Sequence, residues 1–179
     1  KEKQISSEYK FKGRIINLRQ DIALLPNGNT ATREVVEHPG GVCVAALTDN
    51  DELLLVRQWR YPYMEETLEI PAGKRDKKDE DPLECGKREL REETGAICRE
   101  MTYLGLYLSS PAILDEKIYM YLSEDLEFGD TDPDDDEFIE IVKAPLSDLV
   151  DMVIEGKIPD GKTQAAILRA HAMIERRGK

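Results

Sequence analysis

The sequence has little of what a membrane protein, a zinc protein or a secreted protein requires. No apolar run approaches the roughly 20 residues of a membrane-spanning helix, and the first ten residues lack the apolar stretch of a signal peptide. There are only two histidines, and the three cysteines, Cys43, Cys85 and Cys98, form no CxxC pair. We therefore expect no zinc site, reduced cysteines with a packing role, a cytoplasmic location and no membrane partner.

Positive charge is also scarce. The 179 residues carry 37 Asp and Glu against 25 Lys and Arg, which gives a formal net charge of −12. Because so large an acidic excess repels phosphate backbones, nucleic acid is not an expected partner. An anionic substrate would need a cation to bind. Hydrophobic residues make up 40% of the chain, enough for one domain with a small appendage.

Residues 1–38 differ in pattern from the rest of the chain. Short β-type runs occupy residues 9–18, 21–25 and 30–36, and Pro26-Asn27-Gly28-Asn29 forms a turn signal between the last two. We predict an N-terminal antiparallel β module over residues 1–38. Since three strands make a weak core, the module is expected to pack on the rest of the chain or on a second copy of it.

Residues 39–179 mix strands and helices. Runs 42–47 and 52–59 are predicted to form a hairpin of buried strands. Further strands are predicted at residues 67–70, 103–108, 117–122 and 138–142. Helices are predicted at residues 82–94, 146–155 and 162–177. The resulting fold class is α+β, with a mixed sheet between helices in an α/β/α sandwich.

The helix over residues 82–94 has well-marked ends. Asp81 is suited to be its N-cap, Pro82 fits the first helical position, and Gly95 is suited to end it in the left-handed conformation. On this helix Glu89, Glu92 and Glu93 are spaced to project from one side of about one turn.

Three carboxylates so close together destabilise a helix unless a cation lies between them. One interpretation is a solvated helix face on which the glutamates pair with Lys87, Arg88 and Arg91. The other is a site for a hard divalent cation such as Mg²⁺ or Mn²⁺, which carboxylate oxygens bind well. Two or more such ions would neutralise a pyrophosphate and lower the pKa of an attacking water.

The same stretch resembles the Nudix box, G-x5-E-x7-R-E-U-x-E-E-x-G-U with U an aliphatic residue. The matching residues are Gly73, Glu80, Arg88-Glu89-Leu90, Glu92-Glu93 and Gly95. Six residues rather than five separate Gly73 from Glu80, which indicates one extra residue in the loop before the helix. The resemblance implies the Nudix fold over residues 39–179.

Other segments resemble the ADP-ribose pyrophosphatase branch of this family. They are Arg33 to Gly40, Arg57 to Tyr61, Glu69 to Lys74, Ser109 to Pro111 with Asp115-Glu116, and Asp135 to Glu140. The resemblance implies Mg²⁺-dependent hydrolysis of ADP-ribose to AMP and ribose 5-phosphate. The alternatives are another nucleoside diphosphate sugar, such as GDP-mannose or ADP-glucose, and a Nudix-like module that senses nucleotides without turnover.

The resemblance also implies roles for individual residues. Metal ligands would be Glu89, Glu92, Glu93 and the main-chain carbonyl of Ala72. Supporting roles would fall to Gly73, Glu80, Arg88 and Gly95. Glu92 is in addition a candidate catalytic residue, and the acidic stretch after residue 130 offers Asp135 and Glu137 as candidate general bases.

Substrate binding is predicted from residues outside the box. Arg57 and Arg60 are candidates for the phosphates or the terminal ribose, and Trp59 for stacking on adenine, although Trp59 also fits a core position. Arg33 and Glu34 lie near the junction of the two parts of the chain. There, relatives bring residues of both subunits of a domain-swapped homodimer into the cleft.

Overall fold

The computed structural model describes residues 1–76, 78–132 and 138–178. Its strands are β1 (Lys3–Lys12), β2 (Asn17–Leu24), β3 (Thr30–Glu37), β4 (Gly41–Ala46), β5 (Glu52–Arg60), β6 (Glu65–Glu69), β7 (Ala72–Lys74), β8 (Ala96–Ile97), β9 (Met101–Tyr107), β10 (Ile118–Ser123), β11 (Glu127–Phe128) and β12 (Ile139–Pro145). Its helices are α1 (Pro82–Thr94), α2 (Leu146–Ile154) and α3 (Gly161–Arg177). No helix in these ranges is long and apolar enough to cross a membrane.

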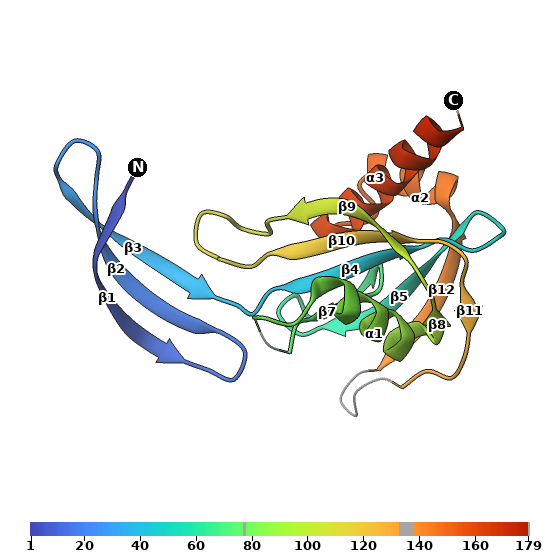
Figure 1. Cartoon of the computed structure of the whole chain (residues 1–179), viewed down its shortest axis with the longest axis horizontal. Helices are drawn as coiled ribbons and strands as arrows, with labels where there is room; N and C mark the ends of the chain where they lie inside the picture. Colours follow the sequence, from blue (N-terminus) through green and yellow to red (C-terminus); the bar gives the residue numbers. More distant parts are fainter. Residues whose placement is uncertain (77, 133–137, 179) are drawn as a thin grey trace.

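Strand β4 lies at the centre of an α/β/α sandwich (Figure 1). It belongs to the mixed sheet β7-β4-β10-β9, in which β4 and β10 run parallel. Successive side chains of a strand point to opposite faces. Val44 packs with Leu90 of α1, whereas Cys43 packs with Leu149 of α2 and Ile167 of α3. The predicted mixed sheet between helices is confirmed.

The predicted hairpin of residues 42–47 and 52–59 was wrong. Strands β4 and β5 meet only at the isolated bridge between Leu47 and Leu53 and then enter different sheets. Strand β5 is the centre of the antiparallel sheet β12-β5-β6. Since β4 and the stretch Leu53 to Val56 of β5 are buried, their apolar pattern does not specify a pairing partner.

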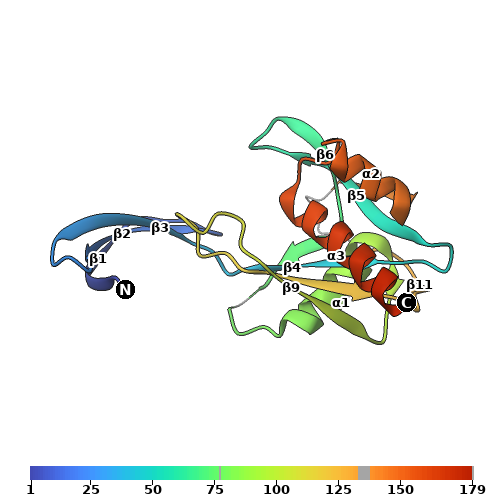
Figure 2. The ribbon, with the colours of Figure 1, turned by 90° about the horizontal axis from the view of Figure 1, so that it is seen from above.

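The N-terminal module is the antiparallel sheet β1-β2-β3, which stands apart from the sandwich in both views (Figures 1 and 2). The single strand predicted over residues 9–18 was wrong, because the chain turns between Lys12 and Asn17. The turn predicted at residues 26–29 is confirmed. The end of β3 is tied to the sandwich at Val36, whose N–H donates to Ile113 O (2.7 Å) and whose carbonyl accepts from Asp115 N (3.0 Å).

Helix α1 has the ends that the sequence predicts. The Asp81 carboxylate accepts hydrogen bonds from the N–H groups of Leu83 (2.8 Å) and Glu84 (3.2 Å). Gly95 ends the helix with φ 71°, and its N–H donates to Arg91 O (2.8 Å). The three cysteines are buried and free, and burial raises the pKa of the Cys43 and Cys85 thiols to about 12.

Gly95 is required by more than its backbone angle, because a Cβ there would lie 2.4 Å from Gly129 O. Gly156 has a similar φ of 73° but would place a Cβ in open space. We expect Gly156→Ala to lower the free energy of unfolding by about 1 kcal/mol, and Gly95→Ala by about 3 kcal/mol, since the second also forces the backbones apart. Urea denaturation of both variants measures the difference. Equal losses would show that the contact with Gly129 contributes nothing.

Candidate active site

The three glutamates of α1 face strand β7 because the other side of the helix is buried. Leu90 packs against β4, and Gly86 lets the helix approach so closely that a Cβ would lie 3.1 Å from the Val42 side chain. The carboxylates of Glu89 and Glu93 are consequently directed to the start of β7. The structure therefore brings Ala72, Gly73 and the helix carboxylates together, as the sequence predicted.

Glu89 and Glu93 of α1 lie against the first two residues of β7. A Cβ at Gly73 would lie 1.9 Å from the carboxylate carbon of Glu89, so Glu89 occupies the space that any side chain at Gly73 would need. The N–H of Ala72 donates to Glu93 Oε2 (2.9 Å), and Glu93 is only 4% exposed. Glu93 is thus much more buried than a solvated helix face would allow, which argues against that interpretation.

Arg88 holds the acidic groups of the site together. Its Nη1 lies 2.8 Å from Glu89 Oε1 and 2.9 Å from Glu92 Oε2, and its Nη2 lies 3.4 Å from Glu80 Oε1. Burial alone would lower the pKa of Arg88, but Glu89 and Glu92 outweigh it and the pKa is raised. Arg88 is therefore a permanent cation that two glutamates share.

The loop between β7 and α1 is closed by a residue that the sequence analysis missed. Arg75 donates through Nε (2.9 Å) and Nη2 (2.6 Å) to the carbonyl of Glu80. The Glu80 carboxylate in turn accepts from Asp76 N (2.7 Å). Arg75 is one of four basic residues among positions 74–81, so its charge did not single it out in the sequence.

The donor set fits a hard divalent cation. Glu89 and Glu92 supply carboxylate oxygens that already converge on one positive group, beside the segment carrying the Ala72 carbonyl. Within the described ranges, no three acidic, histidine or cysteine side chains are already arranged around a common point as metal ligands. Metal binding at this place would therefore replace the contacts of Glu89 and Glu92 with Arg88.

The predicted substrate-binding residues of β5 lie on opposite faces of the strand. Arg60 shares a face with Leu54, which packs against α1, and it forms two hydrogen bonds of 2.6 Å with Glu69. Arg57 and Trp59 share the other face, where they line a groove of about 380 Å³. Of these three residues, only Arg60 lies on the face of β5 that packs against α1.

Arg33 and Glu34 lie on β3, in the module that stands apart from α1 (Figure 1). The Arg33 guanidinium donates to both carboxylate oxygens of Glu2 (3.0 and 2.7 Å), and Glu34 is exposed. The structure does not bring these two residues to the box of the same chain.

The candidate bases Asp135 and Glu137 lie outside the described residues. The chain approaching them is fastened to the end of α1, since Gly129 N donates to Gly95 O (2.8 Å) and Asp132 N donates to Glu92 O (3.0 Å). The segment therefore reaches the box before it enters residues 133–137.

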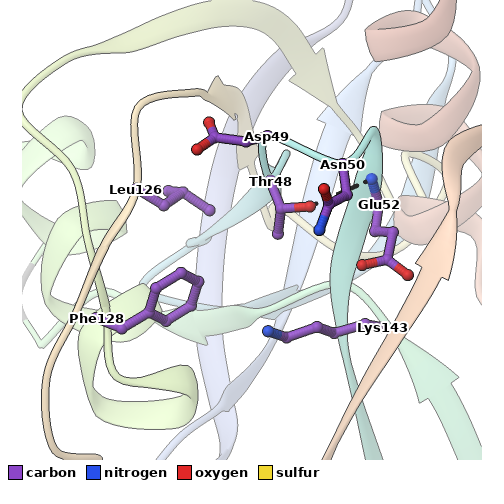
Figure 3. A pocket seen from close by; sticks show the side chains of 7 residues that line it. All are labelled: Thr48, Asp49, Asn50, Glu52, Leu126, Phe128 and Lys143. Carbon is purple, nitrogen blue, oxygen red and sulfur yellow. Dashed lines mark hydrogen bonds between the residues drawn. The ribbon is translucent and has the colours of Figure 1, made fainter.

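A second cavity, of about 160 Å³, lies between the β4–β5 turn, β11 and β12 (Figure 3). Its lining residues are Thr48, Asp49, Asn50, Glu52, Leu126, Phe128 and Lys143. The Lys143 ammonium lies 4.9 Å from the centre of the Phe128 ring. None of the predicted site residues lines this cavity, so it is separate from the candidate active site.

Comparison with known proteins agrees with this geometry. The NUDIX domain model matches residues 37–166, and the model of the nucleoside diphosphate sugar hydrolase N-terminal domain matches residues 2–36. The chain belongs to the Nudix family. A crystal structure of an ADP compounds hydrolase has the same fold, with a TM-score of 0.87 at 21% identity over 99% of this chain and 96% of that one.

Several curated proteins of this family are similar over most of their length. An ADP-ribose pyrophosphatase of Bacillus subtilis is 38% identical over 93% of this chain and 90% of its own. A methanol dehydrogenase activator of Bacillus methanolicus is 39% identical over the same shares. A GDP-mannose pyrophosphatase of Yersinia enterocolitica is 33% identical over 73% of each chain.

The contact between Gly73 and Glu89 can be tested directly. Gly73→Ala is expected to push the Glu89 carboxylate from the site and to lower kcat/KM for a nucleoside diphosphate sugar by about 100-fold, because a misplaced metal ligand weakens the whole site. The Glu89 carboxylate is the end of a flexible side chain and can move aside, so the melting temperature should change little. Gly129→Ala is the control, since its Cβ would meet Ile97 at an ordinary 3.5 Å. Equal activity in the two variants would contradict the prediction.

Proposed function

We propose that this Nudix protein hydrolyses the pyrophosphate of ADP-ribose to AMP and ribose 5-phosphate. One observation supports this best. Glu89 and Glu92 both contact the Arg88 guanidinium, and Glu93 accepts a hydrogen bond from Ala72 N beside them. ADP-ribose pyrophosphatases of Bacillus subtilis and Mycobacterium tuberculosis are 38% and 34% identical over 93% and 94% of this chain.

Nudix hydrolases use divalent metals, and we assign Mg²⁺ here, replaceable by Mn²⁺, with two or more ions. Glu89, Glu92, Glu93 and the carbonyl of Ala72 would hold them. The ions would neutralise the pyrophosphate and lower the pKa of the attacking water. Arg88 and Glu80 keep the glutamates in place around this position, and Gly73 leaves room for the Glu89 carboxylate.

The reaction requires a group that accepts a proton. The water oxygen attacks one phosphorus, the bond from that phosphorus to the bridging oxygen breaks, and the bridging oxygen leaves with the second phosphate. We assign the proton to Asp135 or Glu137, with Glu92 as a third candidate. Asp132, the last described residue before this stretch, donates its N–H to Glu92 O at the end of α1 (3.0 Å), which supports this assignment.

Substrate recognition is proposed to involve two copies of the chain. Arg60 faces the glutamates and is assigned to the phosphates. Arg33, Glu34, Arg57 and Trp59 point elsewhere in their own chain, so they would serve the cleft of a partner. We therefore propose a homodimer in which the module of residues 1–38 docks on the Nudix domain of the partner, residues 39–179.

The surface of the N-terminal module supports this dimer. Every residue of β1 is exposed, including Ile5 (56%) and Phe11 (55%). Apolar side chains gathered on one small sheet are typical of an interaction surface. Sedimentation is expected to give twice the chain mass of 20.4 kDa. The Ile5→Ser/Phe11→Ser variant should shift it toward one chain mass. A wild-type mass near 20.4 kDa would exclude the dimer.

The proposed activity is tested by incubating the protein with ADP-ribose, GDP-mannose, ADP-glucose and NADH, with Mg²⁺ and with chelator. We expect release of AMP from ADP-ribose, loss of activity on chelation, and a fall of at least 1,000-fold in Glu93→Gln, because the amide can accept the Ala72 hydrogen bond but carries no charge for a metal. Retained activity in Glu93→Gln would remove Glu93 from the metal site.

The panel also separates the alternatives. A preference for GDP-mannose would keep the chemistry and change the substrate, as the Yersinia relative allows. Tight binding of a nucleotide sugar without turnover would indicate a sensing module. The similarity to a methanol dehydrogenase activator makes activation of a dehydrogenase a further candidate, tested by adding the chain to that enzyme's assay.

We also place the protein in the cytoplasm, where its three buried thiols would stay reduced.

A further inference from the structure

A buried ionic cluster lies directly before the strand that carries Ala72 and Gly73. The carboxylate of Glu69 is 2% exposed and receives hydrogen bonds from four donors. They are Arg60 Nε and Nη2 (2.6 Å each), Thr67 Oγ1 (2.6 Å) and Lys162 Nζ. The two oxygens of Glu69 therefore hold the guanidinium of Arg60 in one plane and one direction.

Arg60 lies on the side of β5 that faces α1. Arg60 shares its face of β5 with Leu54, which packs against Leu90 of α1. The hydrogen bonds to Glu69 raise the pKa of Arg60, and the charge of Glu93 contributes to the rise. Arg60 is thus bonded to a buried anion and lies on the face of β5 that packs against the helix of the box.

The other end of the cluster is the first turn of α3. Lys162 lies 3.0 Å from Asp160 Oδ2, and the same Asp160 caps the helix by accepting from Thr163 N (2.9 Å). Thr163 Oγ1 accepts from Ile70 N (3.0 Å), the residue next to Glu69. One helical turn therefore holds two consecutive residues of the segment that leads to Ala72.

A cluster of this kind is a poor way to gain stability, because removing charged groups from water offsets their attraction. Burial alone would raise the pKa of Glu69, yet the bonds from Arg60 and the charge of Lys162 lower it to about 2. Glu69 is therefore ionised whenever the protein is folded near neutral pH. The effect of the Glu69 carboxylate in the structure is to orient its neighbour, because its two hydrogen bonds hold the Arg60 guanidinium in one position.

We propose that Lys162 and Glu69 are positioning residues for the hydrolytic reaction, which hold the Arg60 guanidinium toward the diphosphate of the substrate. The proposal rests on the proposed function and extends it, since neither residue belongs to the box or faces the substrate. Lys162 fixes the Glu69 carboxylate, and Glu69 fixes Arg60. The first turn of α3 is thereby coupled to phosphate binding at α1.

A double-mutant cycle tests the proposal. Glu69→Gln keeps the shape of the side chain and removes its charge, and Arg60→Gln removes the guanidinium. We expect each single variant to lower kcat/KM by 10- to 100-fold. Because Glu69 acts through Arg60, adding Glu69→Gln to Arg60→Gln should lower kcat/KM by less than about twofold further. The melting temperature should still fall when Glu69 is replaced, since the buried Lys162 loses one of its two carboxylate partners and keeps only Asp160.

Lys162→Met provides a milder variant that keeps the aliphatic length of the side chain. It should lower kcat/KM by about tenfold in the wild-type background and leave it unchanged in Arg60→Gln. Lys157→Met is the matched control, because Lys157 is an exposed lysine paired with Glu155 at 2.5 Å. Its activity should equal that of the wild type.

Failure of the proposed function is distinguished by a second readout, the affinity for ADP measured by calorimetry in the presence of Mg²⁺. If the wild type turns over no sugar nucleotide, the proposed function fails, and the same coupling between Glu69 and Arg60 must then appear in ADP affinity. Fully additive losses in the double variant overturn the positioning role. So does a Glu69→Gln variant with a lowered melting temperature and unchanged kcat/KM.

Discussion

The repulsion between three carboxylates on one turn of α1 is the constraint on which the rest of the site depends. Arg88 lies between Glu89 and Glu92 and the N–H of Ala72 bonds Glu93, and these contacts offset the repulsion. This compensation requires β7 to lie against the helix. This close approach excludes a side chain at Gly73. The packing of α1 against β4 likewise leaves little room for a side chain at Gly86.

The sequence predicted elements whose signals are local and missed those whose partners are distant. Helix α1 was predicted correctly because Asp81 and Gly95 act within a few residues of its ends. Strand β4, in contrast, pairs in parallel with β10, more than 70 residues later. The residues of an apolar strand buried on both faces do not specify a distant partner, so the sequence pattern favours pairing with the nearest apolar run.

The same distinction applies to the candidate site. The spacing of the glutamates on α1 was sufficient to place their carboxylates together, since helical geometry alone determines it. The cluster around Glu69 could not be predicted from the sequence, because Lys162 follows Glu69 by 93 residues. A single charged residue beside an apolar strand resembles an ordinary surface charge until the fold shows that it is buried. Positioning residues are in general harder to predict than ligands, because their role depends on tertiary contacts.

Strand β5 links the proposed dimer to the proposed chemistry. Residues two apart on a strand share a face, so Arg60 cannot lie on the same side as Arg57 and Trp59. Arg60 is directed to α1 by Glu69, whereas Arg57 pairs with Glu140 at 3.2 Å on the opposite face and Trp59 is 53% exposed. If all three bind substrate, they cannot bind the same molecule within one chain. Joint participation therefore requires a second copy, whose cleft would lie against the groove that Arg57 and Trp59 line.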